Sequence, residues 1–314
     1  MVNLCFRRSK NMQLYKINNY KVIAKNFYRE RNIIKTLEFY NKAYNTSMGS
    51  KDVELLLDMA LVYDELGEYE KAEKKYKEIL KVNPKDSRAF YGLAIIYDNK
   101  EQYKKAIKLY EKAIEYDKNY NRAYFFLAGA YDNVGEKEKA IKCYEKVISL
   151  DEKDFWSYVN LSSIYEEVGF LERALCLADK ALELYPNHYM PLFNKGIVYK
   201  KLNKLEEAIS NYKLSIEDNE NYSYSYLNLA VIYKELKDYK KAINIISEGI
   251  LNNTEEGFLY YNRACYYTYL KEYEKAMKDL YEAVELYPGF VKYIKEDEEL
   301  HILKDRKDFM NLIK

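Results

Sequence analysis

Four asparagines recur at intervals of 34 residues in the second half of the chain, at Asn160, Asn194, Asn228 and Asn262. Each stands among apolar residues, as in the stretch YVNLSSIY at 158–165. A side-chain amide offers both a hydrogen-bond donor and an acceptor, which are the two groups that an extended peptide backbone can pair with. The spacing raises the hypothesis that these amides form a ladder for a peptide.

Residues that carry catalysis or bind metals are sparse. The two histidines, His188 and His301, are far apart in the sequence, and the four cysteines are scattered without a CxxC pair. No GxSxG, GxxxxGK or HExxH motif occurs. The sequence therefore predicts a protein that is not an enzyme and has no metal site and no cofactor. The cysteine pattern favours a reducing, cytoplasmic location.

Composition excludes other classes of protein. The 51 basic and 50 acidic residues nearly cancel, so attraction of the whole surface to nucleic acid or to an acidic membrane is not expected. No apolar run approaches the roughly 20 residues that span a bilayer. With only ten glycines and four prolines in 314 residues, the chain favours helix almost throughout.

The chain is organised by self-similarity with a period of 34 residues. A tyrosine series stands at Tyr63, Tyr97, Tyr131, Tyr165, Tyr199, Tyr233 and Tyr267. An alanine series stands at Ala72, Ala106, Ala140, Ala174, Ala208, Ala242 and Ala276. A third series holds only small residues, Ala60, Ala94, Ala128, Ser162, Gly196, Ala230 and Ala264. Each series steps without a slip, so the units have a common structure.

One unit illustrates that structure. In residues 87–120, apolar residues follow helical spacing, are interrupted by DNKEQ at 98–102, and resume helical spacing from Tyr103. This pattern predicts two antiparallel helices joined by a short turn. One such hairpin cannot bury both of its apolar stripes, so neighbouring units must stack on one another.

The pattern resembles the tetratricopeptide repeat, whose units carry a large residue at position 4, Leu at 7, a small residue at 8, Tyr at 11, Ala at 20, an aromatic at 24, a small residue at 27 and Pro at 32. Seven units match most of it, at 53–86, 87–120, 121–154, 155–188, 189–222, 223–256 and 257–290. Departures occur at position 24, with Ala178, Ile246 and Leu280, and at position 7, with Lys195 and Arg263.

The resemblance implies an all-α fold, a right-handed superhelical solenoid of antiparallel two-helix repeats. Residues 17–52 fit a degenerate first repeat, and residues 1–16 are an N-terminal extension that is a candidate for disorder. The charged, amphipathic tail at 291–314 leaves the pattern and fits a helical cap. A cap is expected because the last repeat would otherwise expose an apolar face.

Helix geometry places the asparagines, which occupy position 6, away from the packing residues. Each residue advances about 100°, so positions 4, 8 and 11 of the first helix share one side, and positions 2, 6, 9 and 13 lie nearly opposite. By resemblance, this second face lines a concave groove. Large apolar residues flank the amides at positions 2 and 5, namely Trp156, Met190, Phe193, Tyr224, Phe258 and Tyr261. Amides beside an apolar strip predict a peptide-binding groove built from these residues and the four asparagines.

A structural explanation stays open beside this one. Asparagine is the usual residue at position 6 in the family, and the aromatics at position 2 could pack between units. The first half of the chain has no ladder, since position 6 holds Asp58, Gly92 and Phe126 there. Position 2 in that half holds Glu54, Arg88 and Arg122, and position 12 changes along the chain from Asp64, Asp98, Asp132 and Glu166 to Lys200 and Lys234. This charge gradient could orient a partner, and a solvated face explains it almost as well.

The sequence thus predicts a non-catalytic adaptor or scaffold that binds an extended segment of a partner protein. One alternative is a self-assembling scaffold, whose groove takes its own N-terminal segment or a second copy. Another is an RNA-binding helical repeat protein. Such arrays usually repeat every 35 residues and have basic grooves, so the 34-residue period and the balanced charge disfavour them. Neither nucleic-acid binding nor membrane insertion is expected.

Overall fold

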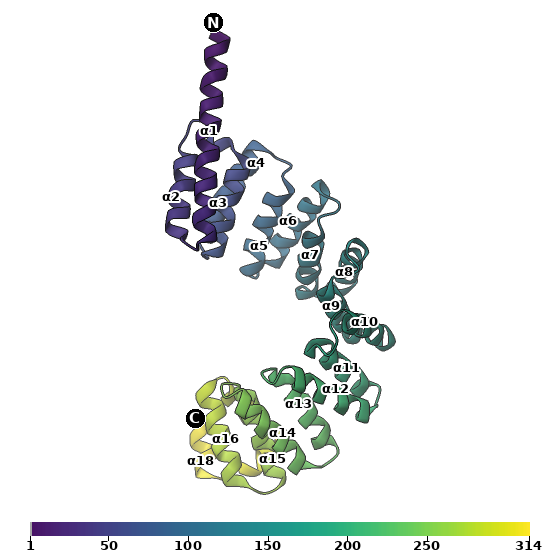
Figure 1. Ribbon diagram of the computed structural model, residues 1–314. Coiled ribbons are helices and arrows are strands. Elements are labelled where there is room, and N and C mark those ends of the chain that lie inside the picture. Colours follow the sequence, from purple (N-terminus) through teal and green to yellow (C-terminus); the bar gives the residue numbers. More distant parts are fainter. Residues whose placement is uncertain (1) are drawn as a thin grey trace. The chain divides into compact units, whose positions relative to one another are not determined.

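The computed structural model describes residues 2–314, with side chains from Met12 onward. Every element in that range is a helix, which confirms the expected all-α class. The chain divides into two compact units, Met1–Glu152 (unit 1) and Lys153–Lys314 (unit 2). Within each unit, consecutive helices form antiparallel pairs, as Figure 1 shows.

Unit 1 begins with a long helix, α1, that pairs with α2 where the sequence places the degenerate first repeat. Residues 2–16, expected as an extension, lie in the same helix as the residues that follow them. Three further hairpins complete the unit. The bounds are α1 Val2–Arg29, α2 Ile33–Tyr44, a 3-10 turn η1 Gly49–Lys51, α3 Val53–Glu65, α4 Tyr69–Val82, α5 Ser87–Asn99, α6 Tyr103–Tyr116, α7 Asn121–Asn133 and α8 Lys137–Leu150.

Unit 2 consists of four hairpins followed by a C-terminal segment of short helices. The bounds are α9 Phe155–Glu167, α10 Leu171–Leu184, α11 Tyr189–Lys201, α12 Leu205–Asp218, α13 Ser223–Glu235, α14 Tyr239–Asn252, α15 Gly257–Tyr269, α16 Tyr273–Leu286, α17 Phe290–Glu296, the 3-10 helix η2 Glu298–Leu303 and α18 Lys307–Leu312. We call the first helix of each repeat helix A and the second helix B.

Helix A ends in the same way in all seven repeats. The residue at position 15 takes a positive φ in Gly67, Glu101, Gly135, Gly169, Asn203, Lys237 and Lys271. The next backbone N–H then donates to the carbonyl of the tyrosine at position 11, as from Glu68 N to Tyr63 O at 2.9 Å. This Schellman motif satisfies carbonyls that the end of a helix leaves free and reverses the chain into helix B.

The small residues are buried where helices cross. All seven members of the alanine series have no exposed surface, which lets helices A and B approach closely. Tyrosines at position 24, such as Tyr76, Tyr110 and Tyr212, fill the space beside them and are among the largest fully buried side chains. Apolar residues form a series of clusters between neighbouring helices, as expected where each hairpin contacts only its neighbours.

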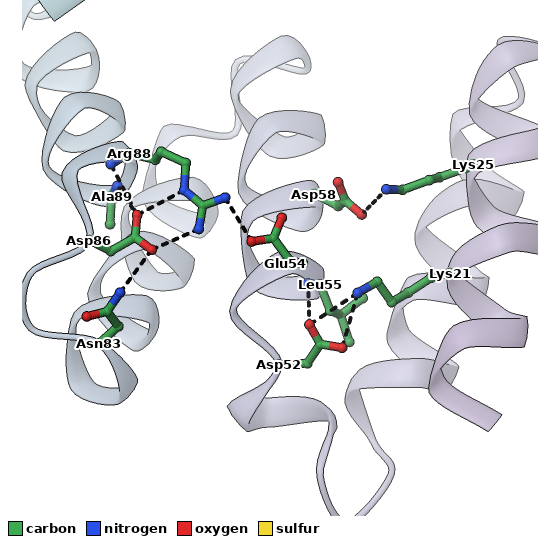
Figure 2. A network of polar contacts seen from close by, with 10 residues as sticks. All are labelled: Lys21, Lys25, Asp52, Glu54, Leu55, Asp58, Asn83, Asp86, Arg88 and Ala89. Carbon is green, nitrogen blue, oxygen red and sulfur yellow. Dashed lines mark hydrogen bonds and ion pairs between the residues drawn. The ribbon is translucent and has the colours of Figure 1, made fainter. Parts of the chain in front are cut away.

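Ion pairs and apolar contacts attach the ends of the array. In unit 1, Lys21 Nζ of α1 lies 3.1 Å from Asp52 Oδ2, which also caps α3, and Lys25 Nζ lies 3.0 Å from Asp58 Oδ2, as Figure 2 shows. In unit 2, the C-terminal segment covers the last hairpin. Its apolar side chains Ile294, Leu300, Leu303 and Phe309 have no exposed surface and join the cluster formed by α13 to α16.

Two helical glycines give a matched test of this packing. A Cβ on Gly92 would stand 2.1 Å from Cζ of the buried Tyr76 ring, whereas a Cβ on Gly129 would meet only Tyr144 Oη, at 3.8 Å. We therefore expect Gly92→Ala to lower the free energy of unfolding by about 1–3 kcal/mol, because the ring cannot move freely. Gly129→Ala should raise it by about 0.5–1 kcal/mol, because alanine favours helix.

Urea denaturation followed by circular dichroism measures both effects. A stability of Gly92→Ala equal to that of the parent chain would contradict the close contact between α4 and α5.

Candidate functional site

Unit 2 contains all the residues of the predicted groove, and its four A helices, α9, α11, α13 and α15, carry one asparagine each. Asn194 is buried between two repeats. It is 8% exposed, and its Nδ2 donates to Val159 O of α9 at 3.1 Å. Position 6 faces the preceding A helix here, so this amide joins two repeats, which is the structural explanation that the sequence left open.

The other asparagines are partly buried on the A helices. Asn228 Nδ2 donates to Tyr224 O at 3.0 Å, and Asn262 Nδ2 donates to Phe258 O at 2.7 Å. Both bonds run to a carbonyl four residues earlier in the same helix. Each primary amide still has a second N–H and an oxygen with two lone pairs, so a bound chain could use these groups. Asn160 occupies the equivalent place on α9.

The apolar residues of unit 2 form a continuous row of rings. The aromatic row comprises, in the order of their contacts, Trp156, Phe155, His188, Tyr189, Tyr222, Tyr224 and Phe258. Its ring centroids follow one another at 5.1, 4.6, 4.8, 4.9, 5.7 and 5.3 Å, and it crosses the start of all four A helices. Trp156 is 46% exposed and Tyr224 is 50% exposed, so the row combines a fixed geometry with accessible ring faces.

His188 belongs to the row as a neutral ring. Its Nδ1 accepts a hydrogen bond from Met190 N at 3.2 Å and so caps helix α11. Burial lowers the pKa of His188, and nearby Asp218 opposes that effect. An accepting Nδ1 and a lowered pKa both mark an uncharged imidazole, which stacks on Tyr189 as another aromatic would.

The remaining predicted groove residues are less available. Met190 packs against the cluster of Phe155 and Val159, and the Phe193 ring lies 5.0 Å from that of Tyr222. Tyr261 is engaged by the C-terminal segment: its ring stacks on Phe290 at 5.5 Å and its hydroxyl donates to Asp297. The structure therefore brings Trp156, Tyr224 and Phe258 together in the row, and it covers Tyr261 with the cap.

Unit 1 holds a cavity that the sequence analysis did not predict, with a volume of about 580 Å³. We call it the unit 1 cavity. It lies along the A helices α3, α5 and α7 and is lined by Leu57, Leu61, Asp64, Tyr76, Arg88, Tyr91, Gly92, Ile95, Asp98, Asn99, Tyr120, Arg122 and Phe126. Position 6 holds Gly92 and Phe126 in place of asparagine. The missing asparagines were the only sequence signal for the cavity, and they do not reveal that the Tyr76 ring forms part of its wall.

The charged groups of the unit 1 cavity differ in their surroundings. Arg88 is held by Asp86, at 2.9 Å from Nη2 to Oδ2, and by Glu54, at 2.8 Å from Nη1 to Oε1 (Figure 2). Asp64 and Asp98 instead accept from tyrosine hydroxyls of helices B, Tyr76 at 2.5 Å and Tyr110 at 2.8 Å. Burial raises the pKa of both carboxyls, and the hydroxyl donors oppose that shift.

Sequence comparison identifies the repeats. Models of the tetratricopeptide repeat match residues 57–115, 122–154, 177–210, 223–253 and 259–290. Among curated proteins, none matches the chain. Within the described part of the chain, no group of three or more His, Cys, Asp or Glu side chains is placed to hold a metal ion. Nor is any helix of that part both long enough and apolar enough to cross a bilayer.

Solved structures resemble the chain in fold. A tetratricopeptide repeat protein from Parabacteroides merdae is 19% identical, with a TM-score of 0.65 over 82% of this chain and 99% of that one. A chain of the APC/C hetero-tetramer Cut9-Hcn1 is 18% identical, with a TM-score of 0.57 over 90% of this chain and 52% of that one. YrrB, described as a tetratricopeptide repeat protein with an unusual peptide-binding site, is 21% identical. Its TM-score is 0.53 over 59% of this chain and 95% of that one. Identities this low establish the fold alone.

The two kinds of asparagine can be separated by their effect on stability. Asn194→Ala removes a buried hydrogen bond between repeats and leaves a small void, so we expect a loss of about 1–2 kcal/mol in the free energy of unfolding. Asn228→Ala removes a bond within one partly exposed helix turn and should change stability by less than about 0.5 kcal/mol. Equal effects in urea denaturation would contradict the distinction.

Proposed function

Because the chain belongs to the tetratricopeptide-repeat family, we propose that it is a non-catalytic scaffold that binds an extended segment of a partner protein on the aromatic row of unit 2. Repeats of this family serve protein interaction, so a protein partner is the starting expectation. The aromatic row is the observation that carries the proposal. Its rings contact one another across four A helices, and two of them remain about half exposed.

Exposed aromatic rings suit this task. Tyrosine and tryptophan supply a large contact area with few rotatable bonds, so ordering them on binding costs little conformational entropy. The contacts between rings already restrict Trp156 and Tyr224. A contiguous exposed apolar strip is also what marks interaction sites on folded proteins. The row would therefore grip side chains of the partner.

The partly buried amides supply the polar half of the proposed site. We assign Asn160, Asn228 and Asn262 to the backbone of the bound segment, which alternates donors and acceptors as an amide does. Asn194 takes a positioning role instead, since its bond to Val159 O fixes α11 against α9.

The described cysteines, Cys143, Cys176 and Cys265, are free, which supports the proposed reducing, cytoplasmic location.

The only tryptophan of the chain, Trp156, lies in the aromatic row and provides a direct readout. Linear heptapeptides selected from a random phage-displayed library on the full chain should include members that change Trp156 fluorescence. For such a peptide, Tyr224→Ala should raise the dissociation constant about tenfold or more, because an exposed ring that is buried on binding contributes about 1–2 kcal/mol.

Phe170→Ala is the matched control. Phe170 is 54% exposed and also belongs to unit 2, but it is the N-cap of α10, beyond the C-terminal end of α9, where it contacts Tyr165. Its removal should leave the dissociation constant unchanged. The proposal is wrong if no selected peptide alters Trp156 fluorescence, or if the Tyr224→Ala and Phe170→Ala variants bind equally well. Light scattering that gives a stable oligomer of the 37.6 kDa chain would favour self-assembly instead.

A further inference from the structure

Two carboxylates that line the unit 1 cavity make no ion pair with any residue that the structure describes. Position 12 is charged in six successive repeats, and four of these side chains make ion pairs: Asp132 with Lys137, Glu166 with Lys201, Lys200 with Glu235, and Lys234 with Glu299. Asp64 and Asp98 are the exceptions, since neither makes an ion pair with a described residue. Both line the cavity.

Their position makes an added cation favourable. Asp64 and Asp98 stand in the last turns of α3 and α5, where the helix dipole already places partial negative charge. Each receives only a neutral tyrosine hydroxyl, and Asp64 Oδ1 is buried without a hydrogen-bond partner in the described chain. Two partly desolvated carboxylates in this arrangement attract a cation more strongly than carboxylates in water do.

The rest of the cavity suits the stem of a long basic side chain. Leu57, Leu61 and Ile95 provide aliphatic surface, and Tyr91 and Phe126 provide rings whose centroids are 6.0 Å apart. Lysine and arginine bury their methylene stems on such surfaces and keep their charge at a polar end, and aromatic faces attract cations as well. Apolar residues next to the basic residue in the ligand would pack on the same aliphatic and aromatic side chains.

Arg122 limits what else can bind. It lies in the first turn of α7 at the wall of the cavity and is exposed. Its guanidinium is always charged, so it repels a ligand that carries many cations. The cavity is therefore selective for a single basic residue among apolar ones, and not for a polybasic segment.

We propose that the unit 1 cavity binds a lysine or arginine side chain of an extended partner segment, with the cationic group between Asp64 and Asp98 and the adjoining apolar residues on Leu61 and Phe126. This goes beyond the proposed function, because the site lies in the other unit and has a different chemistry. It does not depend on the aromatic row.

The test starts from the same random heptapeptide library, panned on the full chain and on the Asp64→Asn/Asp98→Asn variant. Asparagine keeps the shape of aspartate and removes its charge. The parent chain should enrich peptides with one Lys or Arg among apolar residues, and the double variant should lose that enrichment. A labelled synthetic copy of an enriched peptide should bind the double variant about tenfold or more weakly by fluorescence anisotropy, because a charge-assisted contact is lost.

Two controls isolate the charge. Asp132→Asn removes an aspartate at the same repeat position that is paired with Lys137 at 2.7 Å and does not line the cavity, and it should leave binding unchanged. Replacing the Lys or Arg of the peptide by Gln should weaken binding to the parent chain to the same degree as the double variant does. This second control needs no altered protein, so the proposal stays testable if the double variant does not fold.

The proposal is overturned if the parent chain enriches no basic residue, if the Gln peptide binds as well as the original, or if a folded double variant keeps full affinity. The Tyr224→Ala variant should bind the enriched basic peptide with unchanged affinity. Peptides that change Trp156 fluorescence report on the aromatic row alone, because no tryptophan lines the unit 1 cavity. Failure of one site is thus distinguishable from failure of the other.

Discussion

Each helical hairpin of this protein has two apolar stripes and can bury only one of them within itself. Stacking on the next hairpin is therefore obligatory, and the small residues at positions 8 and 20 exist to make the approach close enough. The apolar core is accordingly a series of clusters, each shared by neighbouring helices. The last hairpin meets the same constraint, and the C-terminal segment satisfies it with Ile294, Leu300, Leu303 and Phe309.

This constraint also decides which surfaces are free to bind. Stacking buries one side of each helix, so the opposite face of the A helices carries side chains that the packing does not need. The division is not sharp. Asn194 of helix α11 bonds to the preceding repeat, and the Tyr76 hydroxyl of a B helix donates to Asp64 of an A helix. The same repeat position therefore serves packing in one repeat and is open to a ligand in another.

The two units use this face differently. In unit 2, large rings at the start of the A helices contact one another and leave Trp156 and Tyr224 accessible. In unit 1, a smaller residue at Gly92 and carboxylates at Asp64 and Asp98 leave a cavity with a charged wall. The two proposed sites thus differ in chemistry, and each would take its own kind of segment. The repeated hairpin sets where the side chains of the A helices lie, and the residue types at those positions differ between the two units.

The sequence by itself determined the class of fold, because helical spacing within a 34-residue repeat predicts paired helices that must stack to bury their apolar stripes. It also placed Trp156, Tyr224 and Phe258 on the face of the A helices opposite the packing residues, since helical phase fixes direction. Only the tertiary structure decided that Asn194 is buried, that Tyr261 bonds to Asp297 and that Asp64 and Asp98 pair with no cation among the described residues. The physical reason is that phase within a helix is local, whereas burial and charge pairing depend on side chains from another helix.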